Sequence, residues 1–213
     1  SPSATAHDPG GETQPEPDAL ADFSPSAVAA VFSGMAPSVG ERLARSHPHL
    51  IGSLDGAPAP LRYLANRLLI LEHIGRLEEL LADVDAPDPL GWLRLFRSPF
   101  PFQWHPVGEL RESVIGRIRG QIDRYRTWID EDRQILLFES RGDGKVVEVF
   151  GDLQRAEHVA VVIPGMANDL DGFDAEGSGL RDAAAQLYSA ATDVDHATAT
   201  IAWLGYDPPD GAD

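Results

Sequence analysis

The amino-acid sequence predicts an α/β protein in which helices come first and strands come last. Apolar residues recur at helical spacing in two long stretches, about 60–83 and about 107–129. From Arg133 the period changes to short runs of β-branched and aromatic residues, and the first two runs are joined by an Asp-Gly turn. A strand, an Ala-rich helix and another strand follow. This order is typical of a βαβ unit, which implies parallel pairing and a right-handed crossover.

The composition divides the chain into three parts. Residues 1–22 are rich in Pro, Gly, Ser and Thr and carry acidic side chains, so we expect a disordered acidic tail or linker. Residues 23–132 are expected to form a helical extension. Residues 133–213 are expected to supply the strands of the sheet and the helix between two of them.

The charge of the chain argues against two kinds of partner. Its 213 residues are 43% hydrophobic and 24% charged, and the formal net charge is −17. A nucleic acid or an anionic membrane would require a basic face, whereas the Lys and Arg residues are scattered. No apolar run reaches the roughly 18 residues that a membrane span needs. The absence of Cys excludes disulfides and thiolate metal sites but leaves a secreted and a cytoplasmic location equally open.

Capping signals mark the start of the helical extension. Ser24 precedes a Pro and is expected to cap a short helix. Ser38 and Glu41 have the spacing of a capping box. The stretch 47–60 is punctuated by Gly and Pro and is expected to be an ordered loop.

The apolar runs after Arg133 predict four strands. "RQILLFES" and "KVVEVFGD" predict a hairpin. "HVAVVIPG" is a continuous apolar run, typical of a strand that is covered on both faces. "ATATIAWLGYDPP" predicts a further buried strand, in which Trp203 is expected to pack in the core. Without a partner beside it, the strand 197–204 would form a hydrophobic sheet edge.

The turn "IPGMAND" lies where a parallel sheet binds ligands, at the carboxyl end of a strand. The main-chain N–H groups of Gly165, Met166 and Ala167 could bind an anion or a developing oxyanion there. The alternative is that the Pro-Gly pair only ends the strand, and the motif alone leaves both interpretations open. Tyr206 and Asp207 follow the next strand and are candidates for lining the same pocket.

Four stretches in this order resemble the beginning of an α/β-hydrolase: "HPHLIGSLDGAPAPLRYLANRLLI", "DRQILLFE", "HVAVVIPGMANDLDGF" and "IAWLGYDPP". The chain is most similar to an actinomycete-type α/β-hydrolase family long catalogued as a domain of unknown function. The resemblance covers about Phe23 to Pro209. It implies the front half of an α/β-hydrolase-like, mostly parallel sheet with an N-terminal helical extension.

The resemblance also implies serine-hydrolase chemistry on an ester, thioester or amide, with a small-molecule acyl substrate and with neither cofactor nor metal. In such enzymes, the loop after the third strand supplies one oxyanion N–H and the nucleophile elbow supplies the other. Carried onto this sequence, the backbone donor is Met166, with Ala167 next. The expected substrate-binding residues are Gly165, Asn168, Asp169, Tyr206 and Asp207.

The sequence departs from the family pattern in one large respect, because it contains no G-x-S-x-G elbow. The near match "APSVG" places Ser38 in a helical or loop context, where a helix cap is the expected role. We therefore expect the Ser nucleophile, the acid and the His on the C-terminal remainder of the hydrolase domain. That remainder is expected to exist as a second chain that stays associated with this one.

Other readings of the sequence remain open. A non-catalytic binding or secretion-associated module on a hydrolase-like scaffold is the main alternative. A nucleotide-binding protein is disfavoured by the lack of a G-x-G-x-x-G or P-loop motif. The acidic stretch "DLDGFDAEGSG" departs from the EF-hand pattern, since Gly172 is fourth rather than sixth, and an acidic solvated loop is expected. The His residues are expected to have structural or surface roles.

Overall fold

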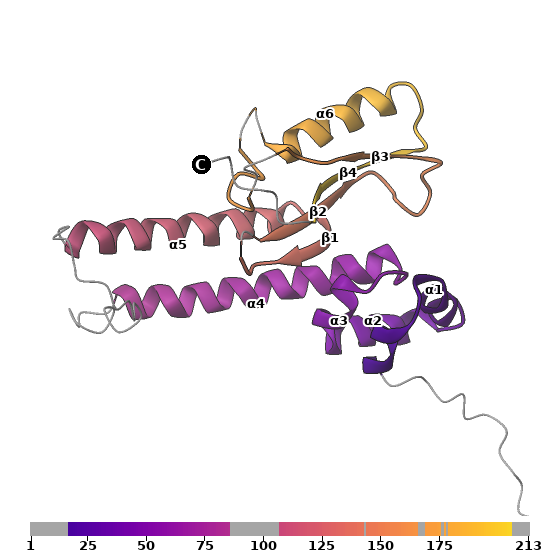
Figure 1. Ribbon diagram of the computed structural model, residues 1–213, viewed down its shortest axis with the longest axis horizontal. Helices are drawn as coiled ribbons and strands as arrows, with labels where there is room; N and C mark the ends of the chain where they lie inside the picture. Colours follow the sequence, from indigo (N-terminus) through magenta and orange to yellow (C-terminus); the bar gives the residue numbers. More distant parts are fainter. Residues whose placement is uncertain are drawn as a thin grey trace, which may run out of the picture.

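Figure 1 shows the computed structural model of the protein, which describes residues 17–85, 107–142, 144–165, 169–175, 177 and 179–205. Two long helices lie side by side along the molecule. A sheet with one further helix lies at one end of this pair, and the small amino-terminal helices lie beneath that end. The long helices are α4 (Ala59–Asp85) and α5 (Val107–Asp130), close to the two expected from the apolar spacing.

The helical extension opens with short elements that begin at prolines. These are η1 (Pro17–Asp22), α1 (Pro25–Ser33), α2 (Pro37–Ser46) and α3 (Pro48–Ser53). Proline suits the first turn of a helix because its fixed φ is helical and its missing N–H has no intrahelical acceptor there. The cap expected before α1 is confirmed, since the Ser24 hydroxyl accepts a hydrogen bond from the Ala27 N–H at 3.3 Å.

Three expectations for this region are wrong. Residues 17–22 are a 3₁₀ helix rather than part of a disordered tail, because Leu20 is buried in the core between the small helices. Ser38 does not cap α2: the helix begins at Pro37 after Ala36, which leaves Ser38 inside the first turn. The expected loop 47–60 contains α3, which starts at its proline like its neighbours.

The sheet has four described strands in the order β1-β2-β4-β3. They are β1 (Gln134–Glu139), β2 (Lys145–Phe150), β3 (His158–Val162) and β4 (Thr198–Leu204), with α6 (Leu180–Thr192) between the last two. β3 and β4 run parallel, whereas β1–β2 and β2–β4 are antiparallel pairs. The α/β class with an N-terminal helical extension is confirmed. We expected mostly parallel pairing, but among these four strands only β3 and β4 are parallel. The other two pairs are antiparallel because β2 runs opposite to both of its neighbours, β1 and β4.

The position of β4 differs from the expected one. It pairs with β2 on one side and with β3 on the other, so it is an inner strand, and β1 and β3 are the two edges of the described sheet. The crossover through α6 returns the chain into the space between the hairpin and β3. The expectation of a sheet edge at 197–204 is therefore wrong.

The main core joins the two long helices to one face of the sheet and to α6. Its largest fully buried side chains include Trp128 and Tyr125 of α5 and Phe173 of the loop before α6. A single polar residue links α4 to β1 through this region: the fully buried Asn66 donates to the carbonyls of Gly52 and Ile135 and accepts from the Phe138 N–H. Among the described helices, none is both long enough and apolar enough to cross a membrane.

Candidate functional site

The carboxyl ends of β3 and β4 lie together at one edge of the sheet, as parallel pairing requires. The register pairs Val162 with Ala202, and Gly165 follows β3 by three residues. Gly165 is exposed, and a Cβ atom added there would meet no described atom within 4 Å. The other end is tighter, because a Cβ at Gly205 would overlap the Trp203 indole. Among the described residues, the position beside Gly165 at the end of β3 is therefore less crowded than the position beside Gly205 at the end of β4.

Most of the expected site residues lie outside the described part of the chain. These are Met166, Ala167, Asn168, Tyr206 and Asp207. Of the remaining two, Gly165 is described above and Asp169 closes a turn. The Asp169 Oδ1 atom accepts a hydrogen bond from the Gly172 N–H at 2.7 Å, the behaviour expected of an Asp that starts a turn. One oxygen of this carboxylate thus shapes the loop, and its role toward a substrate stays a prediction.

The loop 169–175, between β3 and α6, is held by α5 and by Arg133, which lies between α5 and β1. Arg124 of α5 donates to the Leu170 carbonyl and to the Asp171 carboxylate, both at 2.9 Å. The Asp174 carboxylate accepts from the Trp128 indole N–H and, at 2.9 Å, from Arg133. The acidic stretch was expected to be a solvated loop. Instead, Asp171 and Asp174 bind arginines, and among the described residues no cluster of three or more His, Asp or Glu could hold a metal ion.

Glu148 lies at the centre of a buried charge cluster that the sequence analysis missed. Only 3% of it is exposed, on the face of β2 that packs against the main core. Arg181 of α6 lies 3.2 Å from its Oε2 atom and Arg133 lies 3.7 Å from the same atom. Burial raises the pKa of Glu148 to about 7, although both arginines oppose this shift. The only signal in the sequence was one Glu inside the apolar run "KVVEVF".

The two arginines are shared among three carboxylates. Arg133 contacts Glu131 and Asp174 at 2.8 and 2.9 Å, closer than its contact with Glu148. The Glu148 Oε2 atom is buried and has no aligned hydrogen bond. With three acids and two bases, the cluster would carry an excess negative charge if all groups were ionised. The least exposed acid, Glu148, is therefore the one that retains a proton most readily.

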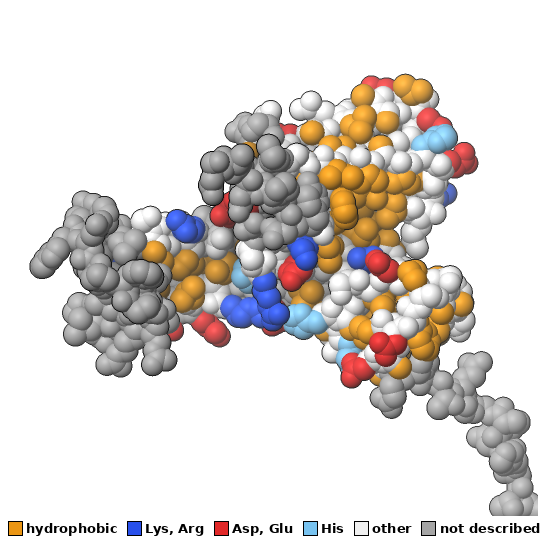
Figure 2. Space-filling model, viewed as in Figure 1, with side chains coloured by type: hydrophobic (Ala, Val, Ile, Leu, Met, Phe, Trp, Pro, Cys, Tyr) orange, Lys and Arg blue, Asp and Glu red, His pale blue; other side chains and the backbone are white. Residues whose placement is uncertain are grey.

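In the described part of the chain, the opposite face of the sheet is exposed along β3. Paired residues share a face, so Val161, Ile201 and Val149 lie in one row and Trp203 lies beside Val147. Along this face the β2 residues are buried, whereas Val159, Val161 and Ile163 are 49%, 52% and 53% exposed. Figure 2 shows hydrophobic side chains gathered over the sheet between α6 and α4.

A cavity of about 630 Å³ opens on this face. Its wall is formed by Val147, Val161, Ile163, Ile201 and Trp203, and the α3–α4 region supplies its polar rim. Two expectations are corrected here. "HVAVVIPG" is not covered on both faces by the described residues, and Trp203 lines the cavity instead of packing in the core.

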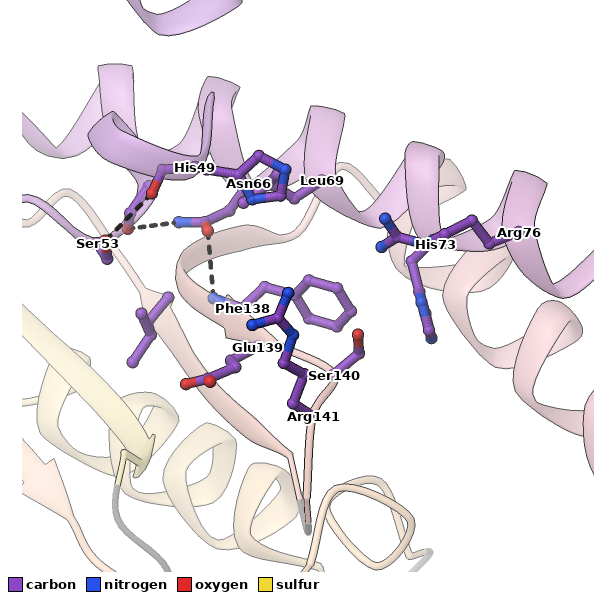
Figure 3. A pocket seen from close by; sticks show the side chains of 12 residues that line it. His49, Ser53, Asn66, Leu69, His73, Arg76, Phe138, Glu139, Ser140 and Arg141 are labelled. Carbon is purple, nitrogen blue, oxygen red and sulfur yellow. Dashed lines mark hydrogen bonds between the residues drawn. The ribbon is translucent and has the colours of Figure 1, made fainter. Parts of the chain in front are cut away.

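A second cavity, of about 580 Å³, lies between α4 and the end of β1 and is shown in Figure 3. Two of its polar side chains bind the main chain: Asn66 accepts from the Phe138 N–H, and the Ser53 hydroxyl donates to the His49 carbonyl at 3.2 Å. The His73 ring packs edge-on against Tyr125 and tilted against Phe138, and burial lowers its pKa. The ring contacts of His73 with Tyr125 and Phe138 fit the structural role expected for this residue.

Comparison with known proteins found a family model that matches the C-terminal part of the chain. Residues 139–213 match a family model described as alpha/beta hydrolase. That match begins at the last residue of β1 and takes in β2, β3, α6 and β4, the strand order described above. No solved structure matches the chain.

Two curated relatives come from strains of Mycobacterium tuberculosis. They are the uncharacterized protein MT2140 of strain CDC 1551 / Oshkosh and the uncharacterized protein Rv2079 of strain ATCC 25618 / H37Rv. Each is 26% identical over 193 residues, an alignment that covers 79% of this chain and 26% of the relative. This chain therefore spans about a quarter of their length. The family match covers only about the last third of the chain, whereas the alignment with these relatives covers 79% of it. The alignment therefore reaches into the helical extension.

The parallel β3–α6–β4 unit lies inside the segment that matches the family model. Residues 139–213 are thus similar to the alpha/beta hydrolase family, in agreement with the resemblance seen in the sequence.

Proposed function

We propose that this chain is the front portion of a serine hydrolase that cleaves an ester, thioester or amide of a small acyl substrate. The observation that supports this most is the pair of parallel strands whose carboxyl ends meet beside a Pro-Gly turn, within the segment that matches the hydrolase model. In an open α/β sheet this edge binds the ligand.

In this proposal the main chain of the turn performs electrostatic catalysis. A serine hydroxyl outside this sequence attacks the acyl carbonyl, a His takes its proton, and the carbonyl oxygen becomes an oxyanion. The backbone N–H of Met166, with that of Ala167 next, donates a hydrogen bond to that oxyanion. The leaving group departs with the proton from the His, and water then releases the acyl group by the same steps. Gly165, Asn168, Asp169, Tyr206 and Asp207 are the proposed substrate-binding residues.

The proposed nucleophile-bearing partner is the C-terminal remainder of the same domain, associated as a second chain. Two features of the described residues support it. In the described part of the chain, no strand pairs with the outer edge of β3, and the adjoining face exposes Val159, Val161 and Ile163. Exposed strand edges next to apolar surface favour pairing with another strand. A strand added beside β3, with a helix over this face, would bury all three side chains.

A fluorophosphonate probe tests this proposal on the protein purified with its natural remainder. We expect one labelled serine, on a peptide outside residues 1–213, and co-purification of the labelled polypeptide with this chain. Ser38→Ala is the matched control and should leave labelling unchanged, because Ser38 lies inside α2. A label within residues 1–213, or a preparation that contains only the unlabelled 23.0 kDa chain, would contradict the proposal. A folded, associated but unlabelled complex would indicate the binding module instead.

A further inference from the structure

Two arginines line the cavity between α4 and the end of β1. Arg76 reaches it from α4, and Arg141 reaches it from the turn that follows β1 (Figure 3). Its wall also includes Leu69 and Phe138, which are each 7% exposed. With a volume of about 580 Å³, the cavity lies within the size range of small-molecule sites in proteins. It has room for an apolar group beside the two guanidinium groups.

Ion pairing at this cavity leaves one basic side chain without a counterion. Glu72 binds Arg76 at 2.6 Å, and Glu139 binds Lys145 at 3.2 Å. Each of these carboxylates is therefore matched by a basic group. Arg141 is exposed, and in the described part of the chain no carboxylate pairs with it. An excess positive charge thus lies at the cavity, in a chain whose formal net charge is −17.

The two guanidinium groups keep hydrogen-bond donors for a ligand. A guanidinium presents its N–H donors in one plane, a geometry that matches a carboxylate or a phosphate. Glu72 contacts Arg76 through the Nη1 atom, and none of the described side chains binds the guanidinium of Arg141. An apolar wall beside such donors excludes water, which strengthens their attraction for an anion.

We propose that this cavity binds a small organic anion: Arg141 and Arg76 bind its phosphate or carboxylate group, and an apolar part of the ligand packs on Leu69 and Phe138. Hydrogen bonds from a guanidinium to such a group are stronger than neutral ones. The inference does not rest on the proposed function. The cavity lies beside β1, whereas the proposed reaction takes place at the end of β3, the opposite edge of the described sheet.

Titration calorimetry on the protein with its natural remainder, at low ionic strength, tests the chemistry of the ligand. Phenyl phosphate and benzoate each join an anionic group to a ring. Inorganic phosphate and acetate lack the ring, and benzyl alcohol lacks the charge. At least one of the two ring-bearing anions should bind about tenfold more tightly than its bare anion and than benzyl alcohol. The tighter of the two identifies a phosphate or a carboxylate ligand. A ring that adds no affinity, or no binding of any probe, would overturn the proposal.

Three variants locate the binding. Arg141→Gln should raise the Kd of the tighter probe at least about tenfold, because it removes the unpaired charge. Arg155→Gln is the matched control, since it removes the same charge from an exposed arginine beyond the other end of β2, and Kd should stay within about twofold. Glu72→Gln should lower Kd about two- to threefold, because it removes the carboxylate that competes for Arg76. Far-UV circular dichroism checks that each variant folds. An unchanged Kd in Arg141→Gln, or an equal loss in Arg155→Gln, would overturn the site.

Modification by phenylglyoxal gives a second readout at the residue itself. Arg141 and Arg155 are both exposed, so both should react, as measured by peptide mass spectrometry. The tighter probe, at about ten times its Kd, should slow the modification of Arg141 about tenfold and leave that of Arg155 unchanged. Equal modification of Arg141 with and without the probe would overturn the proposal, even where calorimetry detects binding elsewhere on the protein.

Discussion

Replacement of Glu148 by Gln gives a sharp test of the buried charge cluster. Glu148, Asp174 and Glu131 share two guanidinium groups, those of Arg133 and Arg181. Burial is the largest influence on Glu148 and raises its pKa to about 7; the arginines act in the opposite direction, and Asp174 adds a smaller upward effect. Because the neutral form is favoured in the folded protein, ionisation of Glu148 must weaken the fold.

The magnitude follows from the difference between the folded and unfolded states. A carboxyl whose pKa rises from 4.5 to about 7 on folding corresponds to about 3 kcal/mol, at about 1.4 kcal/mol per pKa unit. The pKa of Glu148 is higher in the folded state than in the unfolded state. This contribution to stability is therefore fully present below the unfolded-state pKa and is lost as the pH rises through the folded-state pKa. Between about pH 5 and about pH 8, about 2 to 3 kcal/mol is expected to disappear.

Urea unfolding of the wild-type protein and of Glu148→Gln at both pH values measures this loss. Other titrating groups contribute to both proteins, so the difference between their free energies of unfolding isolates Glu148. We expect the wild type to lose about 2 to 3 kcal/mol relative to the variant between about pH 5 and about pH 8. Equal pH dependence would refute the reasoning from burial. A wild type that gains stability relative to the variant as the pH rises would show that the arginines outweigh burial.

Three further outcomes are expected. Asn66→Ala should lower the free energy of unfolding by about 2 to 3 kcal/mol, because the Ile135 carbonyl and the Phe138 N–H lose their Asn66 partner, while the Gly52 carbonyl keeps its Arg62 donor; a loss below about 1 kcal/mol in urea unfolding would contradict this. Gly56→Ala should cost more than about 3 kcal/mol, since φ is +90° and the added Cβ would overlap the Pro25 carbonyl. Its control, Gly75→Ala in α4, meets no atom within 4 Å and should stabilise by up to about 1 kcal/mol in the same assay. Val161→Lys should leave this chain as stable as before in thermal unfolding but weaken its association with the proposed remainder in a pull-down, and unimpaired association would count against pairing at β3.

The sequence allowed the elements to be predicted better than their arrangement. The apolar spacing located the helix found at Ala59–Asp85 because its pattern persists for several turns. The order of strands was harder, because an apolar run such as "TATIAWL" suits an inner strand and an uncovered edge equally well. Only the crossover through α6 decides that β4 lies between β2 and β3. Short helices were missed where Gly and Pro were read as loop signals, although Pro48 begins α3.

The candidate site was predictable only in part, for a similar reason. The end of β3 could be proposed as a ligand edge from the local motif "IPG", since strand and Pro-Gly pair are adjacent in sequence. The attachment of the loop could not, because Trp128 and Asp174 are 46 residues apart and nothing in their spacing indicates contact. Glu148 was visible as a charge inside an apolar strand, but its two arginine partners, Arg133 and Arg181, come from two separate segments.

The central claim is that the sheet continues past β3 into a segment that carries the nucleophile. Hydrogen exchange of the His158–Val162 amides, compared between this chain alone and the chain with its natural remainder, tests it most directly. The half of these amides that point away from β4 should exchange quickly in the chain alone and at least about a hundredfold more slowly in the complete protein, because a new strand would accept their hydrogen bonds. Equal exchange in the two samples would contradict the account.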